Sequence, residues 1–77
     1  MGAQVVVYAQ GGCQACRLTQ RALERAGVEY EVVDLEENAA ARELLLALEF
    51  TAAPVVTTGE QWWSGFRPDR IKAVTRA

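Results

Sequence analysis

The chain has 77 residues, of which 51% are hydrophobic, and carries 10 acidic against 8 basic residues for a formal net charge of −2. This length predicts one domain with a core near the lower limit of self-sufficiency. The slight acidity argues against nonspecific nucleic-acid binding, and no apolar stretch is long enough to predict a membrane span. Met1 leads almost directly into a predicted strand, so we expect no secretory signal and a cytoplasmic location.

The first predicted strand and helix flank a pair of cysteines. Residues 4–8 are β-branched or aromatic almost throughout, which predicts a buried strand. A helix follows, because apolar residues recur at helical spacing until Gly27 ends the pattern: Leu18, Ala22, Leu23 and Ala26. Cys13 and Cys16, the only cysteines of the chain, lie between the strand and this helix. A Cys-x-x-Cys pair in that context is typical of a redox motif.

The expected chemistry of the pair follows from its place at a helix N-terminus. Free N–H groups and the helix dipole stabilise negative charge there. A cysteine in such a position can have its pKa lowered from about 8.5 to roughly 3.5–7.5. Cys13, preceded by two glycines, is therefore expected to be the exposed nucleophile, and Cys16, one turn inward, the resolving thiol. Arg17 and Arg21 add positive charge nearby.

Three other roles for the cysteines have less support. Two core cysteines at this spacing after a Gly-Gly pair would be unusual. A zinc site normally needs four ligands, and a chain with no histidine and no third cysteine would need a second subunit. A permanent structural disulfide would close a very small loop and stabilise the fold little.

A second strand and a second helix follow. Residues 29–34 alternate around Tyr30 and two valines as a strand, which completes a strand–helix–strand unit of the size that joins parallel strands. Asn38 is expected to cap a helix that reaches Phe50. One face of that helix is predicted to be buried through four apolar residues: Ala41, Leu44, Leu45 and Leu48.

The remainder of the chain predicts a hairpin and a closing helix. Residues 54–58 and 61–64 are short strands, and Gly59-Glu60 suits a two-residue turn between them. Pro68 begins the last helix, which places three apolar residues on one side: Ile71, Val74 and Ala77. The predicted fold is therefore α/β, a four-stranded mixed sheet with three helices in the order β-α-β-α-β-β-α.

The C-terminal segment is basic. Between Arg67 and the end of the chain, four basic residues accompany one acid, Asp69: Arg67, Arg70, Lys72 and Arg76. Such a helix could dock an acidic partner, or its face could simply be solvated, and the sequence leaves both readings open.

The predicted order of elements resembles the thioredoxin-like fold in its minimal glutaredoxin form. Residues 63–69, Trp-Ser-Gly-Phe-Arg-Pro-Asp, are similar to the signature of NrdH-type redoxins, the glutaredoxin-like electron donors to ribonucleotide reductase. Ala-Pro-Val-Val at 53–56 and Val-Val-Asp at 32–34 resemble further stretches of that family. The resemblance covers essentially the whole chain, so residues 1–77 are interpreted as one redoxin domain.

The resemblance implies a small dithiol oxidoreductase with Cys13 and Cys16 as its redox pair. Its electrons would come from thioredoxin reductase, and ultimately from NADPH through the flavin of that enzyme, rather than from glutathione. They would pass to a disulfide on the large subunit of class Ib ribonucleotide reductase. The protein itself would bind no cofactor or metal and work as a monomer. The Ala53–Pro54 peptide bond is expected to be cis.

A partner-binding surface is expected beside the redox pair. The backbone of Ala53 would pair with a partner peptide like an added strand. Because successive strand residues face opposite ways, one of two neighbouring tryptophans is expected in the core and the other exposed as a partner anchor. Arg67 and Asp69 would pair with each other or with nearby backbone. The complete expected surface comprises Ala53, Pro54, Trp62, Trp63, Ser64, Gly65, Phe66, Arg67, Pro68 and Asp69.

The chain departs from the NrdH-type pattern between and before the cysteines, where Ala9-Gln10-Gly11-Gly12 lacks the Pro that often precedes the first cysteine and the Lys or Asn a little earlier. Gln14-Ala15 stands between the cysteines where NrdH-type redoxins usually have Val-Gln, which should change redox potential without removing a catalytic atom. Gln10 stands where glutathione-dependent glutaredoxins carry a cation, and no Asp pair follows Gly65. A glutathione-dependent glutaredoxin is therefore the less favoured alternative. From another class, the alternative is an iron–sulfur or metal carrier with Cys13 of two subunits holding a cluster.

Overall fold

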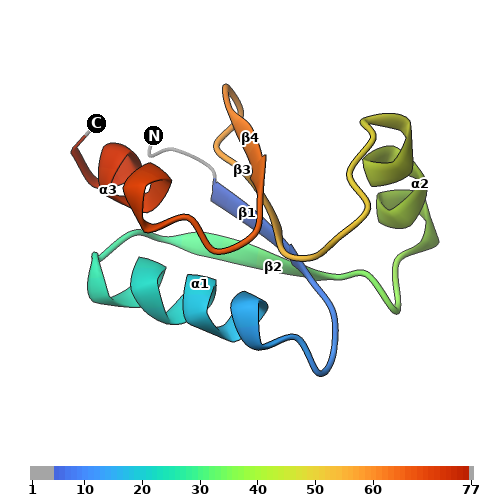
Figure 1. Cartoon of the computed structure of the whole chain (residues 1–77), viewed down its shortest axis with the longest axis horizontal. Helices are drawn as coiled ribbons and strands as arrows, with labels where there is room; N and C mark the ends of the chain where they lie inside the picture. The colour runs from blue at the N-terminus through green and yellow to red at the C-terminus, as the bar shows by residue number, and fades with distance from the viewer. Residues whose placement is uncertain (1–4, 77) are drawn as a thin grey trace.

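A four-stranded sheet with helices on both faces forms the fold in the computed structural model, which describes residues 5–76 (Figure 1). The elements in chain order are β1 (Val5–Ala9), α1 (Gln14–Arg25), β2 (Tyr30–Asp34), α2 (Ala39–Ala47), β3 (Val55–Thr57), β4 (Trp62–Ser64) and α3 (Pro68–Arg76). The sheet order is β2-β1-β3-β4, with β1 parallel to β2 and antiparallel to β3. The predicted fold and element order are confirmed.

The strand register brings three loops to one edge of the sheet. Tyr8 near the end of β1 pairs with Val55 at the start of β3, and Val55 also pairs with Ser64 at the end of β4. The segments that follow β1, precede β3 and follow β4 therefore meet at this edge. These are the loop carrying the cysteines, the segment around Pro54 and the segment after Ser64.

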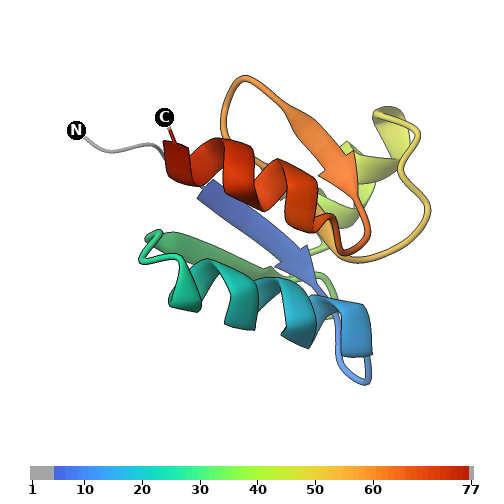
Figure 2. The ribbon, with the colours of Figure 1, turned by 60° about the vertical axis from the view of Figure 1, so that its left-hand side comes forward.

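The larger part of the core lies between the sheet and the helices α1 and α3 (Figure 2). Alternate residues of β1 point into it, and α1 contributes Cys16, Thr19 and Leu23, which recur at helical spacing and are all buried. Its apolar members are Val5, Val7, Ala9, Cys16, Leu23, Val56, Trp63 and Ile71. Cys16 is thus anchored in the same packed cluster that holds α1 on the sheet.

On the other face, α2 is shorter and less buried than the sequence predicts. Asn38 caps it as expected, its side chain accepting a hydrogen bond from the N–H of Ala41 at 2.9 Å. The helix ends at Ala47 rather than Phe50, because the chain turns into the left-handed region at Glu49, whose φ is 69°. The predicted four-residue buried face is also wrong. Ala41 and Leu45 are buried, whereas Leu44 and Leu48 are each 43% exposed, because only one narrow stripe of α2 meets the sheet.

The hairpin and the last helix agree with prediction in kind, and the strands are slightly shorter. Thr57 pairs with Trp62, and the N–H of Thr58 donates to the Gln61 carbonyl at 3.1 Å. This leaves a two-residue turn whose first position, Gly59, has a φ of 95°, a conformation that favours glycine. Pro68 begins α3 as expected. Gln4 and Ala77, predicted in the first strand and last helix, lie outside the described residues.

Candidate active site

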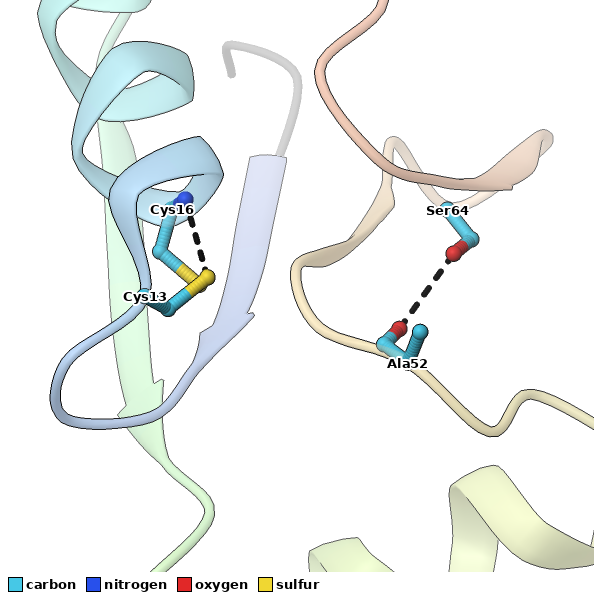
Figure 3. Close-up of a disulfide and its surroundings, with 4 residues drawn as sticks. All are labelled: Cys13, Cys16, Ala52 and Ser64. Atoms are coloured by element: carbon cyan, nitrogen blue, oxygen red, sulfur yellow. Dashed lines mark hydrogen bonds between the residues drawn. A yellow bond between two sulfur atoms is a disulfide. The ribbon is translucent and has the colours of Figure 1, made fainter.

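The two cysteines form a disulfide at the first turn of α1 (Figure 3). Cys13 is the N-cap of the helix, and its sulfur accepts a hydrogen bond from the N–H of Cys16 at 3.1 Å. The Cα atoms of the pair lie 5.2 Å apart. Cys13 is partly exposed at the edge of the sheet, whereas Cys16 is only 2% exposed. An incoming sulfur can therefore reach Cys13 directly but must pass Cys13 to reach Cys16.

The loop before the helix sets this exposure. After β1 ends at Ala9, residues 10–12 are exposed, and Gly12 adopts a φ of 73°, which favours glycine. Cys13 then returns to extended backbone, so its side chain caps the helix while its carbonyl accepts the N–H of Arg17 at 3.3 Å. The sulfur of Cys13 is consequently held over free N–H groups that stabilise negative charge.

The segment around Pro54 lies at the same edge as the disulfide. The Ala53–Pro54 peptide bond is cis, which confirms the prediction. Its position is fixed from β4: the Gly65 N–H donates to the Pro54 carbonyl at 2.8 Å, and the Ser64 hydroxyl donates to the Ala52 carbonyl at 3.2 Å (Figure 3). Ala53 and Cys13 pack against the same core cluster. Within residues 5–76, the backbone of Ala53 makes no hydrogen bond to other backbone groups.

The turn between β4 and α3 is closed by an internal ion pair. Gly65 has a φ of 88°. The guanidinium of Arg67 donates two hydrogen bonds to the carboxylate of Asp69, from Nη2 to Oδ2 at 3.0 Å and from Nε to Oδ1 at 3.2 Å. The hydrogen bonds and charge of Arg67 lower the pKa of Asp69 from its ordinary value. Of the two pairings left open by the sequence, Arg67 and Asp69 therefore pair with each other. Phe66, which precedes them, is 38% exposed.

The two tryptophans separate as strand alternation predicts. Trp63 is 3% exposed in the core under α1 and α3, and the guanidinium of Arg70 lies 5.8 Å from its ring centroid. Trp62 is on the opposite face, only partly buried, and stacks with Tyr8 and Phe50 at 6.1 Å each. The ring of Trp63 is thus inaccessible to a partner. Of the two tryptophans, only Trp62 can be the exposed partner anchor that the sequence predicts.

Comparison with known proteins places this geometry in a family. Residues 5–63 match the glutaredoxin family. The chain is 38% identical over 68 residues to the glutaredoxin-like protein NrdH of Escherichia coli K12, covering 88% of this chain and 84% of that protein. The chain belongs to the glutaredoxin family as an NrdH-type redoxin. It is also 40% identical to the Salmonella typhimurium NrdH protein over 67 residues, or 87% of this chain and 83% of the relative.

Solved structures agree with the sequence match. The Escherichia coli NrdH-redoxin, a glutaredoxin-like protein described as having a thioredoxin-like activity profile, superposes with a TM-score of 0.89 at 37% identity. The match covers 91% of this chain and 92% of that one. The fold is therefore thioredoxin-like, and the redoxin is a thiol-disulfide oxidoreductase with a Cys-x-x-Cys motif.

A shallow pocket beside Ala53 is not predicted by the sequence pattern. The pocket has a volume of about 170 Å³, and the redoxin lines it with Gln10, Leu46, Phe50 and Ala53, among others. The run of leucines in α2 is the signal that could have indicated it, since a short helix cannot bury all of them against one sheet. Gln10 is uncharged, so it does not place at this pocket the cation that glutathione-dependent glutaredoxins carry at the corresponding position.

Two kinds of feature are absent from the described residues, a metal-binding cluster and a membrane-spanning helix. Among the described residues, no group of three or more His, Cys, Asp or Glu side chains is arranged to hold a metal ion. No helix within residues 5–76 is long and apolar enough to cross a membrane.

Proposed function

We propose that this redoxin reduces protein disulfides with electrons from thioredoxin reductase, and that its acceptor is the large subunit of class Ib ribonucleotide reductase. The observation that carries the proposal is the partly exposed Cys13 at a helix N-cap above a buried Cys16. The thioredoxin-like activity profile of the similar Escherichia coli protein supports the choice of electron donor. The redoxin acts as a cytoplasmic monomer without a cofactor of its own, and NADPH is the ultimate source of electrons.

The proposed reaction is two successive thiol–disulfide exchanges. The thiolate of Cys13 attacks one sulfur of the partner disulfide, forms a mixed disulfide and releases the other partner sulfur as a thiolate. The thiolate of Cys16 then attacks the sulfur of Cys13, which restores the Cys13–Cys16 disulfide and releases the first partner sulfur. Two electrons pass to the partner, whose thiolates take up two protons. The dithiol of thioredoxin reductase returns the two electrons by the same exchange.

The proposed docking surface surrounds the disulfide at the sheet edge. The free backbone of Ala53 would pair with an extended partner segment. Ser64, Gly65 and Phe66 follow at the end of β4, and Pro54 lies buried at this edge with less than 2% of its surface exposed. Trp62, at the start of β4, would contact the partner on the face of the sheet where it stacks with Phe50. Arg67, Pro68 and Asp69 contribute by holding the turn rigid, since Arg67 and Asp69 already satisfy each other. Trp63 is buried in the core and would contribute only indirectly, by packing behind this surface.

The two reductants can be distinguished by coupled NADPH oxidation. The oxidised redoxin should be reduced efficiently by thioredoxin reductase and poorly by glutathione with its own reductase, because Gln10 supplies no charge for the tripeptide. Efficient turnover with glutathione alone would contradict the proposal and support an ordinary glutaredoxin. A visible absorption band in the purified protein would instead support the iron–sulfur carrier.

The roles of the two sulfurs can be tested separately. Cys13→Ser should abolish disulfide reduction, whereas Cys16→Ser should still attack and then stall as a mixed disulfide detectable by mass spectrometry. Thiol labelling of the reduced protein across a pH series should find Cys13 reactive at lower pH than Cys16. Greater reactivity at Cys16 would reverse the assignment.

A further inference from the structure

A groove lies between α1 and α3 on the face of the sheet that they share. It has a volume of about 410 Å³, and both helices line it with residues at helical spacing. Its floor includes Leu18 and Ala22 of α1 and Phe66, which precedes α3. Leu18 and Phe66 are 39% and 38% exposed, so apolar surface remains open to solvent inside the groove.

The rim of this groove carries charge of one sign. Arg21, Arg25 and Lys72 line it, and no acidic side chain does. Among the side chains that the structure describes, the ion pair between Arg67 and Asp69 is the only one, so the three rim cations have no carboxylate partner there. The groove is therefore locally basic on a chain whose formal net charge is −2.

The groove opens toward the redox centre. Figure 2 shows α1 and α3 side by side, both beginning at the end of the sheet where β1 finishes. Leu18 follows Cys16 by two residues, and Phe66 follows Gly65, which is hydrogen bonded to Pro54. From Leu18 to Ala26 the helix rises about 12 Å. That length accommodates about three or four residues of an extended chain.

We propose that this groove binds an acidic segment with apolar side chains from the protein partner while the partner disulfide meets Cys13. The inference rests on the proposed function and extends its docking surface beyond the sheet edge. Carboxylates of the segment would face Arg21, Arg25 and Lys72, and its apolar side chains would cover the floor. A peptide suits the site better than an anionic lipid surface, because the three cations line a groove rather than a broad flat face, and a chain with a formal net charge of −2 has no overall attraction to a negative surface.

Two disulfide peptides with the same cysteine loop provide the test. One carries the flank Asp-Glu-Phe-Asp and the other Lys-Lys-Phe-Lys, and single-turnover rates with pre-reduced protein are compared at low and high salt. The acidic peptide should react about ten times faster at low salt, because two or three exposed ion pairs together contribute about 1.4 kcal/mol. The difference should shrink at high salt as the charges are screened.

A matched pair of variants assigns the preference to the groove. Arg21→Gln with Lys72→Gln should remove most of the preference, while reduction of the small, uncharged disulfide bis(2-hydroxyethyl) disulfide stays within about twofold of the parent. The control, Ala39→Glu with Ala40→Glu, lowers the net charge equally at exposed positions in the first turn of α2, where acidic residues are tolerated. The control should keep the preference.

The outcomes separate this inference from the proposed function. Reduction of the small disulfide without preference between peptides would overturn the groove and leave the redox function standing. Failure to reduce any disulfide would contradict the proposed function. Binding of a fluorescent serine version of the acidic peptide to the oxidised protein, measured by anisotropy, tests the groove independently of redox chemistry. Binding to phosphatidylserine vesicles through the same cations, with no peptide binding, would assign the groove to lipid and overturn the proposal.

Discussion

The two faces of the sheet are covered to different degrees. Under α1 and α3, the core includes Val7, Leu23 and Val56, each with 0% exposure. Under α2, the buried cluster is smaller: Leu35, Ala41, Leu45 and Val55. Leu44, Leu46 and Leu48 of α2 are 43%, 64% and 43% exposed. One face is therefore a packed core, whereas the other retains open apolar surface beside the redox edge.

The two faces therefore differ in what they support: one holds the disulfide in place, and the other exposes apolar surface to partners. Helix α1, whose first turn carries the disulfide, is held by the larger core, so the positions of Cys13 and Cys16 are tied to the most buried part of the fold. Open apolar surface beside an exposed disulfide marks sites for protein contact more often than chance exposure. We therefore expect substitutions under α1 to affect stability most and those around Trp62 to affect recognition.

The largest effect is expected from shortening one buried leucine on each face. Leu23→Ala should lower the free energy of unfolding by about 4 kcal/mol, because the surrounding core cannot collapse into the cavity. Leu45→Ala should cost about 2 kcal/mol, since its cluster is small and adjoins solvent. Urea unfolding followed by tryptophan fluorescence measures both values. Equal costs would contradict the difference between the faces.

A smaller loss of stability and a specific loss of activity are expected from Trp62→Ala. The ring stacks with Tyr8 and Phe50 and is partly buried, so its removal should cost about 2 kcal/mol of stability. Turnover with thioredoxin reductase should slow by roughly thirtyfold, as expected when an interface tryptophan is removed. Direct reduction by dithiothreitol should change little.

Leu45→Ala is the matched control for this experiment, because it weakens the same cluster by a similar amount. If both variants slow the reductase equally, Trp62 holds the fold and is not a partner anchor.

A third prediction concerns the contact of α1 with β2. Tyr30 donates to a carboxylate oxygen of Glu24 at 2.7 Å. Burial, this hydrogen bond and the charge of Glu24 raise the pKa of Tyr30 to about 12 from its ordinary value of 10.0. The neutral phenol is favoured in the folded state. Its contribution to stability is therefore complete below pH 10.0 and is lost as pH rises toward about 12.

Tyr30→Phe should lower stability at neutral pH by about 1 kcal/mol. It should also flatten the decline of stability across the alkaline range, which denaturant unfolding at several pH values measures. If stability declines equally steeply with pH in the variant, the decline is caused by another titrating group and not by Tyr30.

The smallest effect is expected at the exposed turn before α3. Hydrogen bonding from Arg67 and its charge lower the pKa of Asp69 below the ordinary value of 3.8. The stabilisation is therefore present above that value and is lost as pH falls through the lower pKa of the folded state. Asp69→Asn should flatten the acid side of the stability profile slightly and leave neutral stability nearly unchanged, as thermal unfolding across pH 2–6 would show. A large loss at neutral pH would mean that the turn supports the core.

Local patterns predicted the elements well and their burial less well. The Asn38 cap, the Gly59 turn and the Pro68 start each depend on a few adjacent residues, and all are confirmed. The end of α2 was predicted three residues too late. Apolar spacing also predicted buried positions for Leu44 and Leu48, whose exposure depends on how closely the helix approaches the sheet.

For the candidate site, the sequence by itself determined the Cys-x-x-Cys pair, its strand-to-helix context and the alternation of the two tryptophans, because spacing and backbone geometry act over a few residues. The resemblance added the signature segment and the cis bond before Pro54. Only the tertiary structure decided that Trp63 is the core ring, that Arg67 binds Asp69, and that α1 and α3 enclose a groove with a basic rim. Those outcomes depend on how elements far apart in the chain pack together, which no local pattern encodes.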